Sequence, residues 1–284
     1  MQPPGKTVSK KHQLGLISCV GIVFGNMIEG IALMPANLAQ IGSVSLFGWL
    51  IVLVGALALA YVYARLAVLN PQSGGPIAYA QEVGSALGFQ SGVLYYNANW
   101  IGNLAIGITA VAYLSTFFPI LNETVPAALA CIALIWVFAG LNLLGCGAVG
   151  KVAVFGLLCM LIPVAATAFF GWFWFDPALY ARNWNVSHLS DGEAVARSIP
   201  LCLWAFIGIE SASVSAGLVK NPRKTVPLAT ILGVGLAGLV YVLSFQAIAG
   251  LFPAEEMAGS GAPFAKAIAL MVGDWAYPLV ALGT

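Results

Sequence analysis

Charged residues are scarce in this 284-residue sequence. Lysine and arginine number 11, aspartate and glutamate number 10, and together they make up only 7% of the chain. In soluble domains about a quarter of the residues are charged. Hydrophobic residues instead reach 61%, and the mean hydropathy is +0.95. This composition excludes a soluble domain and predicts an integral membrane protein, while a net charge of +1 gives no reason to expect a nucleic-acid partner.

Residues that build metal and redox sites are also few. The sequence has two histidines and five cysteines, with no C-x-x-C motif and no closely spaced histidine pair. Isolated cysteines in apolar segments usually act as small hydrophobic residues. Neither H-E-x-x-H nor G-x-S-x-G occurs. We therefore expect no metal, no cofactor and no enzymatic activity.

Long apolar segments define the expected fold. A spanning helix needs roughly 20 mostly apolar residues, and the sequence offers seven such segments and the beginning of an eighth near Tyr277. The seven lie near residues 13–41, 44–69, 87–118, 124–145, 151–175, 195–219 and 226–251. The predicted fold class is therefore an all-α integral membrane protein.

The distribution of positive charge predicts the orientation. With the N-terminus in the cytoplasm, eight lysines and arginines fall on the cytoplasmic side and three on the outer side, and cytoplasmic loops carry the positive excess. The sequence stops eight residues into its eighth segment, which is about 12 Å of helix against a hydrocarbon core of about 30 Å. We expect a fragment of a longer protein, ending after about seven and a half helices.

Two apolar segments contain a carboxylate beside helix-weakening residues. Glu210 lies in the sixth, and Glu29 lies in the first, among Gly25, Gly30 and Pro35. A membrane-embedded carboxylate usually faces a cavity or a partner, and a helix can break at membrane depth only where protein or water satisfies the freed backbone. Two broken helices five segments apart indicate an inverted-repeat transporter. Glycines that serve only close helix packing are the alternative.

Polar and aromatic residues mark further candidates for the site. Tyr95, Asn99 and Asn103 recur every four residues and so share one face of a helix. Alternatively, such amides form hydrogen bonds between helices and have no role in a binding site. Trp204, six residues before Glu210, could cover a cation with its ring, although an isolated tryptophan more often packs or lies at the membrane interface.

Four stretches resemble one known family. They are Gly74-Gly-Pro-Ile-Ala-Tyr79, Leu94 to Thr109, Leu203-Trp-Ala-Phe-Ile-Gly-Ile-Glu-Ser-Ala212 and Val219-Lys-Asn-Pro-Arg-Lys-Thr-Val-Pro227. These stretches are similar to the basic amino acid/polyamine antiporters of the amino acid, polyamine and organocation superfamily. The resemblance covers essentially the whole chain and implies a fold of twelve helices, ten of them in two inverted five-helix repeats. Residues 1–175 would form the first repeat and residues 195–284 part of the second, within one transporter domain over 1–284.

The resemblance also implies roles for individual residues. Trp204 corresponds to an aromatic that packs on the substrate, Ile207 to a residue whose carbonyl meets the substrate's α-amino group, and Glu210 to the proton-responsive glutamate of the sixth helix. Asn103 and Tyr95 match positions that line the same cavity. Ile77 lies near the position of a gating tyrosine in one relative, so that gate is not expected here.

One departure from the family lies at the first break. Family members have Gly-Asn-Met-Met-Gly-Ser-Gly there, and backbone amides of this segment receive the substrate carboxylate. Here the run Gly25-Asn26-Met-Ile-Glu29-Gly30 is one residue shorter. A glutamate at this point is expected to repel an amino acid carboxylate, whereas a diamine could still fit. A damaged or erroneous sequence is the alternative explanation.

The resemblance implies a proton-sensitive antiporter that exchanges a cationic amino acid, lysine, for its decarboxylated diamine, cadaverine. A proton-coupled polyamine or amino acid symporter of the same fold, a non-transporting regulator and a non-functional fragment are the alternatives. The expected partners are the two substrates, protons and the lipid bilayer, with a homodimer as a candidate assembly. The expected location is the inner membrane of a bacterium.

Overall fold

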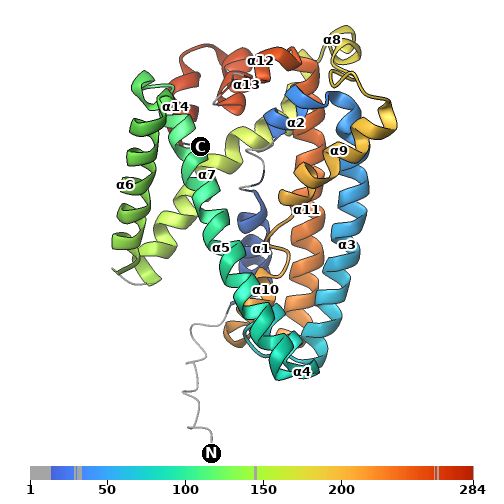
Figure 1. The fold of residues 1–284 in the computed structure, drawn as a ribbon, viewed down its shortest axis with the longest axis vertical. Coiled ribbons are helices and arrows are strands. Elements are labelled where there is room, and N and C mark those ends of the chain that lie inside the picture. Colours follow the sequence, from blue (N-terminus) through green and yellow to red (C-terminus); the bar gives the residue numbers. More distant parts are fainter. Residues whose placement is uncertain are drawn as a thin grey trace, which may run out of the picture. The chain divides into compact units, whose positions relative to one another are not determined.

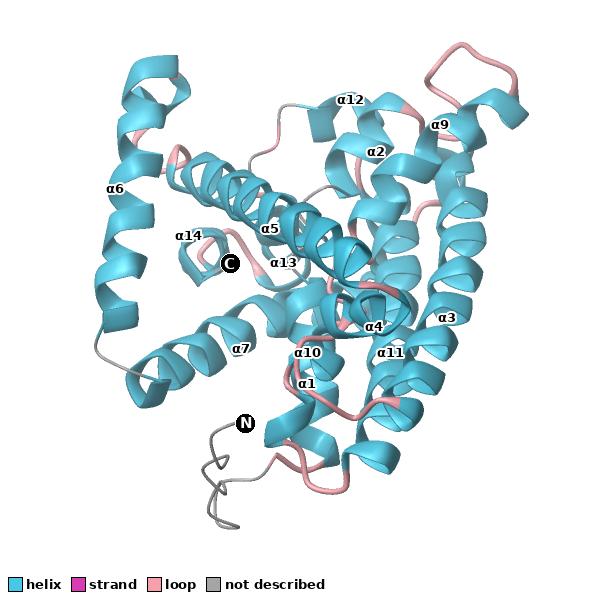
Figure 2. Cartoon of the chain, turned by 60° about the horizontal axis from the view of Figure 1, so that its bottom comes forward, coloured by secondary structure: helices cyan, strands magenta, loops and turns pink. Residues whose placement is uncertain are grey.

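The structure is a computed structural model that describes residues 14–28, 30, 34–143, 146–258, 260 and 262–283. These residues are helical or lie in turns and loops (Figure 1). Figure 2 shows no strand among them, and one isolated parallel bridge joins Leu14 to Val219. The predicted all-α fold class is confirmed.

Each predicted apolar segment contains one or more helices. In chain order the helices are α1 (Leu16–Ile28), α2 (Met34–Gln40), α3 (Leu46–Leu69), α4 (Pro76–Val83), α5 (Ser85–Leu114), α6 (Thr124–Leu143), α7 (Cys146–Phe170), α8 (Pro177–Arg182), α9 (Asp191–Trp204), α10 (Ser211–Val214), α11 (Pro222–Leu251), α12 (Ala254–Ala258), α13 (Pro263–Val272) and α14 (Ala276–Gly283).

The two predicted helix breaks are present. The first segment divides into α1 and α2, and the sixth divides into α9 and α10. The prediction was wrong in detail for Gly25, which lies inside α1 rather than in the break. One glycine costs a helix only about 1 kcal/mol, so α1 continues through it to Ile28. Four short helices were not predicted, namely α4, α8, α12 and α13, because each is shorter than a membrane span.

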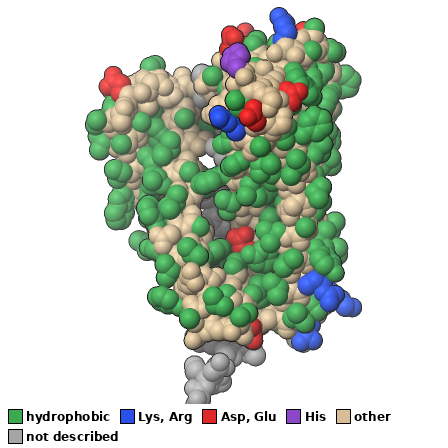
Figure 3. Space-filling view, turned by 45° about the vertical axis from the view of Figure 1, so that its right-hand side comes forward, with side chains coloured by type: hydrophobic (Ala, Val, Ile, Leu, Met, Phe, Trp, Pro, Cys, Tyr) green, Lys and Arg blue, Asp and Glu red, His purple; other side chains and the backbone are tan. Residues whose placement is uncertain are grey.

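Four helical stretches in the described part of the chain are long and apolar enough to cross a membrane: Ser43–Leu69, Thr124–Leu143, Phe155–Trp174 and Pro222–Leu251. Hydrophobic side chains cover most of the face seen in Figure 3. Exposed apolar residues on this scale are stable only against lipid or another apolar surface. The chain is a multi-pass membrane protein.

The chain forms two compact units. The first comprises the described parts of Met1–Ile28, Val52–Asn97 and Phe206–Gly238. In this unit α1 packs against α10 (Figures 1 and 2). Glycines of α11 allow further close packing, since a Cβ on Gly233 would lie 2.7 Å from Val23 of α1 and one on Gly238 would lie 2.2 Å from Leu53 of α3.

The second unit comprises the described parts of Glu29–Ile51, Ala98–Ala205 and Leu239–Thr284. Here α2 packs against α9 and α12, and α13 packs against α7 and α14. Trp49 is fully buried against Tyr241 and Phe245, with ring centroids 5.6 and 5.8 Å apart. Burying such large apolar side chains supplies much of the packing energy of this unit.

Asn183 joins the end of α8 to the end of α11 within the second unit. Its side-chain amide donates to the carbonyls of Ala249 and Phe252, both at 2.8 Å. Its side-chain oxygen accepts from the backbone N–H of Ala254 at 2.9 Å. Only 4% of Asn183 is exposed. One buried side chain therefore satisfies three backbone groups where α11 ends and α12 begins.

Replacing Asn183 by alanine should cost about 3 kcal/mol of stability, because three buried backbone groups would lose their partner. Thermal unfolding in detergent micelles, followed by circular dichroism, measures the change. Asn122→Ala is the control, since Asn122 is exposed and bonds only to the nearby carbonyl of Pro119. Equal melting temperatures for the two variants would contradict the assigned role.

The start of α9 is predicted to lose stability in acid. Hydrogen bonds from Ser190 hold the pKa of Glu193 below its usual 4.5. Bonds from Asn185 and Trp184 hold the pKa of Asp191 below its usual 3.8. Both folded-state pKa values are depressed, so the stabilisation is present above the unfolded values and is lost as the pH falls through the folded ones.

Ser190→Ala should accordingly lower the melting temperature near neutral pH and make the loss between about pH 5 and pH 3 shallower. Both carboxylates are exposed, so the difference is small. The melting temperature measured as a function of pH tests this. Ser115→Ala, which removes a hydroxyl bonded only to the carbonyl of Ala112, should leave the acid profile unchanged.

Candidate functional site

The break in the sixth segment positions Glu210. Helix α9 ends at Trp204, residues 205–210 form turns, and α10 begins at Ser211. Gly208 lies in this turn with a φ of +108°, a conformation that side chains rarely adopt. A Cβ on Gly208 would also lie 3.1 Å from the Cβ of Asn26. Two separate features therefore require glycine at this position, namely the backbone conformation and the close approach of α1.

The two ends of Glu210 have different partners. Its backbone carbonyl accepts from the N–H groups of Ser213 and Val214 at 2.8 and 3.1 Å and from the Ser213 hydroxyl at 2.6 Å. Its carboxylate accepts from the Tyr95 hydroxyl at 3.0 Å. Bonds to the backbone fix the position of the turn, so the carboxylate is held in place while keeping most of its lone pairs available.

A second polar pair joins α1 to the residue after Glu210. The Asn26 amide in the last turn of α1 donates to the Ser211 hydroxyl at 2.7 Å. Ser211 is buried at the first position of α10. The two interrupted segments thus meet through side chains directly beside the carboxylate, and they do so within the first unit.

Glu210 has no cationic partner within the described residues. The single ion pair in the part of the chain that the structure describes joins Lys266 to Glu256 at 2.9 Å. Tyr63 of α3 lies within electrostatic range of the Glu210 carboxylate. A half-buried carboxylate that accepts one hydrogen bond from a neutral hydroxyl can accept further hydrogen bonds from an ammonium group.

The structure brings some of the predicted site residues together. Asn26, Tyr95, Ile207 and Glu210 belong to the first unit, as does Gly25. The side chain of Ile207 is 57% exposed in the turn. Asn26, Tyr95 and Glu210 are linked through the contacts described above, whereas Ile207 and Gly25 contribute backbone to the two broken segments.

The other predicted site residues belong to the second unit. Trp204 is the last residue of α9 and is 39% exposed, and Asn103 is exposed on α5. Gly30 is buried, and a Cβ there would lie 2.3 Å from the Cα of Ala205. Glu29, the predicted carboxylate of the first break, lies outside the described residues.

Two serines in the site were not singled out from the sequence. Ser211 and Ser213 immediately follow Glu210 in a run of small residues, and both are buried. Their hydroxyls contact Asn26 and the Glu210 carbonyl. The signal was present in the sequence as serines at membrane depth, which need a hydrogen-bond partner just as a carboxylate does.

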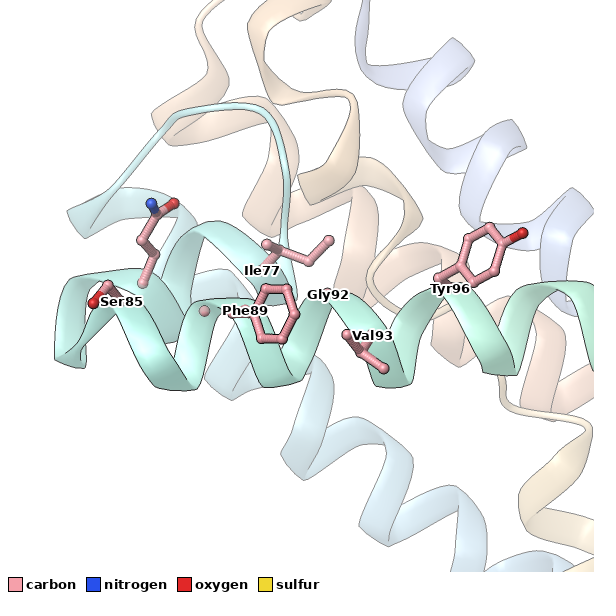
Figure 4. A pocket seen from close by; sticks show the side chains of 8 residues that line it. Ile77, Ser85, Phe89, Gly92, Val93 and Tyr96 are labelled. Carbon is pink, nitrogen blue, oxygen red and sulfur yellow. The ribbon is translucent and has the colours of Figure 1, made fainter.

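A groove of about 500 Å³ lies between α4 and α5 of the first unit. Figure 4 shows Ile77 above Phe89 at one part of the groove and Tyr96 farther along α5. The other lining residues are Gln81, Ser85, Gly88, Gly92 and Val93. None of the predicted substrate-binding residues lines this groove, so it is distinct from the Glu210 site.

The contact between Asn26 and Ser211 is measurable by a double-mutant cycle. Asn26→Ala and Ser211→Ala should each destabilise the protein, and the double variant should lose about 1 kcal/mol less than the sum. Unfolding in detergent micelles gives the three changes. Combining Asn26→Ala with Ser115→Ala is the matched control and should be additive. Additivity for Asn26 and Ser211 would show that the contact contributes nothing.

Known proteins are similar to this chain over almost its whole length. The chain is 59% identical over 278 residues to the cadaverine/lysine antiporter of Escherichia coli K12. It is 37% identical over 268 residues to the putrescine transporter PotE of Haemophilus influenzae, and 35% identical over 265 residues to that of E. coli K12. The alignments cover 98, 94 and 93% of this chain but 63, 62 and 60% of the respective relatives.

A family model for amino acid permeases matches residues 14–284. The match includes both broken segments, Glu210 and its hydrogen-bond partner Tyr95 from α5. Together with the fold and the position of this carboxylate, it shows that the chain belongs to the amino acid permease family.

Proposed function

We propose that the chain forms part of a proton-sensitive antiporter that exchanges lysine for cadaverine. The proposal is supported by 59% identity to a cadaverine/lysine antiporter, against 37% and 35% to the two putrescine transporters. Because the chain spans less than two thirds of these relatives, the exchange activity is proposed for a protein that contains this chain.

The observation that carries the proposal is the environment of Glu210. Its carboxylate accepts a hydrogen bond from Tyr95, and within the described residues no lysine or arginine lies within ion-pair distance of it. Lysine and cadaverine share a primary ammonium on a flexible alkyl chain, which donates three hydrogen bonds. Such a group would form an ion pair with the Glu210 carboxylate.

The same carboxylate would make substrate binding depend on pH. Ionised Glu210 attracts the substrate ammonium, and protonated Glu210 does not. When the cation leaves, a proton can take its place and remove the cost of an uncompensated charge in an apolar segment. Cation and proton would therefore compete for one group, and substrate affinity would fall as the pH falls.

Other parts of the site are included in the proposal. Trp204 would pack on the substrate, the Ile207 carbonyl would meet its α-amino group, and Asn103 would line the cavity. The first broken segment, with Gly25, Asn26 and Gly30, would receive the amino acid carboxylate. This arrangement requires that residues 1–175 form the first repeat and residues 195–284 part of the second.

The proposed location is the bacterial inner membrane with the N-terminus in the cytoplasm. The excess of lysine and arginine on that side supports this orientation. Cysteine accessibility tests it, because a cysteine introduced at Glu123 would react with an impermeant reagent from outside intact cells. Reaction only after permeabilisation would reverse the orientation.

The exchange is tested in proteoliposomes made with a protein that contains this chain. Uptake of labelled lysine should require internal cadaverine and should be inhibited more by external cadaverine than by putrescine. Equal uptake into cadaverine-free vesicles with an imposed pH gradient would favour symport instead. Uptake that neither condition supports would refute transport by that protein.

A further inference from the structure

The first unit carries four exposed basic side chains, which we call the basic patch. Arg65 lies in α3, Lys220 lies in the loop before α11, and Arg223 and Lys224 lie in the first turn of α11. None of them forms an ion pair within the described residues. Arginine and lysine are the side chains that bind phosphate groups, so the patch favours an anionic ligand.

Little negative charge in the first unit balances the basic patch. The described part of this unit contains two carboxylates, Glu210 in the turn after α9 and Glu82 in α4. Glu82 is exposed and accepts a hydrogen bond from the Asn70 amide at 2.9 Å. The positive charge of the patch is therefore open to a ligand from outside the unit.

The packing of α3 on α11 brings Arg65 beside the start of α11. The two helices lie side by side in Figures 1 and 2. The rings of Trp49 and Tyr241 are 5.6 Å apart, and a Cβ on Gly238 would lie 2.2 Å from Leu53. The contact thus moves forward along α3 as it moves back along α11, which shows that the helices are antiparallel. In the same register, Arg65 lies level with the first turn of α11.

Backbone hydrogen bonds fix the loop that carries Lys220. The N–H of Lys220 donates to the Leu14 carbonyl at 2.9 Å, and the N–H of Leu14 donates to the Leu218 carbonyl at 2.9 Å. The Thr225 hydroxyl donates to the Lys220 carbonyl at 2.7 Å. The loop is therefore held both to the residue before α1 and to the first turn of α11, which keeps three cations of the patch together.

Exposed residues, most of them apolar, lead along both helices to the basic patch. The exposed residues that share a face with Arg65 on α3 are Val54, Ala58 and Tyr61, and those that share a face with Lys224 on α11 are Leu228 and Ile231. Each set recurs at intervals of three or four residues, which places its members on one side of the helix. Both helices are long and apolar enough to cross a membrane, so these faces suit acyl chains.

We propose that the basic patch binds the phosphate of an anionic phospholipid, such as phosphatidylglycerol, whose acyl chains lie on the exposed faces of α3 and α11. Basic residues beside a spanning helix attract anionic headgroups. A free phosphate ion matches the charge of the patch but makes no use of the apolar faces that end there. The bound lipid holds this end of α3 and α11 at the depth of the headgroups. Such a site does not depend on the proposed exchange activity.

Site-specific photocrosslinking tests the lipid site. Leu228→p-benzoylphenylalanine places a photoreactive group on the exposed face of α11, one turn from Lys224. The purified chain is illuminated in nanodiscs that contain equal amounts of phosphatidylglycerol and phosphatidylcholine, with one of the two radiolabelled in each sample. Phosphatidylglycerol should be captured at least about fivefold more, since one basic residue contributes roughly this factor near an anionic headgroup. Adding Arg65→Gln and Lys224→Gln should bring the ratio close to one.

Arg182→Gln is the matched control, because it removes an exposed arginine from the second unit and should leave the ratio unchanged. Equal capture of both lipids by the unmodified patch would overturn the lipid site, as would an unchanged ratio after the two substitutions. Displacement of phosphatidylglycerol by millimolar inorganic phosphate would show a site for the free ion instead.

Salt provides a second measurement that needs no substitution in the patch. At about 1 M salt the range of electrostatic attraction falls to about 3 Å, so the preference for phosphatidylglycerol should be lost while phosphatidylcholine is still captured. A preference that persists in high salt would refute recognition by charge, even where the substituted chain fails to fold.

Discussion

Glu210→Gln is expected to lower cadaverine affinity about 100-fold at neutral pH and to abolish the pH dependence of lysine/cadaverine exchange. Glutamine keeps the shape of the side chain and can still accept a bond from Tyr95, but it cannot carry the negative charge that balances an ammonium. Losing one partner of a desolvated charge pair costs about 2–5 kcal/mol. Binding to the purified chain and exchange in proteoliposomes, both measured across pH, check the two parts.

Glu123→Gln is the matched control, because it removes an exposed carboxylate after α5 by the same chemical change. It should leave affinity and pH profile as they are. Glu210→Gln with an unchanged pH profile would assign the proton response to another group. An unchanged cadaverine affinity in the same variant would remove Glu210 from the substrate site altogether.

Gly30→Ala should be among the most destabilising substitutions in the chain. A Cβ at this position would lie 2.3 Å from the Cα and 2.8 Å from the Cβ of Ala205, both in the second unit. Because the nearest atom belongs to the backbone, no side-chain rotation can relieve the overlap. Overpacking of this kind costs about 3 kcal/mol. Thermal unfolding in detergent micelles should show the loss directly.

Gly21→Ala provides the comparison, since Gly21 lies within α1 and a Cβ there would meet nothing within 4 Å beyond its own stretch of helix. Alanine is up to about 1 kcal/mol better than glycine inside a helix, so this variant should be as stable as the unmodified chain or more so. If both substitutions lowered the melting temperature equally, the contact between Gly30 and Ala205 would not be what sets the cost.

The spanning segments were predictable because lipid imposes a simple rule, namely about 20 apolar residues for each crossing. The break beside Glu210 was predictable because glycine weakens a helix by about 1 kcal/mol and a carboxylate at membrane depth usually faces a cavity or a partner. The short helices α4, α8, α12 and α13 were not predicted. These helices begin at local signals, such as Pro76 at the start of α4 and Asp176 as the N-cap of α8. Hydropathy does not detect such signals.

The site was predicted less completely than the fold. Glu210 was identified as a carboxylate in an apolar segment, and residue spacing placed Tyr95 on a polar helix face. Their hydrogen bond was not predicted, because it joins segments far apart in the chain. Gly25 was expected to break its helix and does not, because one glycine costs a helix only about 1 kcal/mol and α1 continues through it to Ile28. Ser211 and Ser213 were not identified, because a hydroxyl indicates a site only when its burial and its neighbours are known.

The hydrogen bond between Asn26 and Ser211 has a consequence for the order in which the protein is made. The two residues are 185 positions apart in the chain. At a synthesis rate of about 5–20 residues per second, roughly 10 to 40 seconds separate their appearance. During that interval α1 must reside in the membrane with its amide paired to water, lipid or the insertion machinery. The Glu210 site is therefore assembled late in biosynthesis, only after the sixth segment has been inserted.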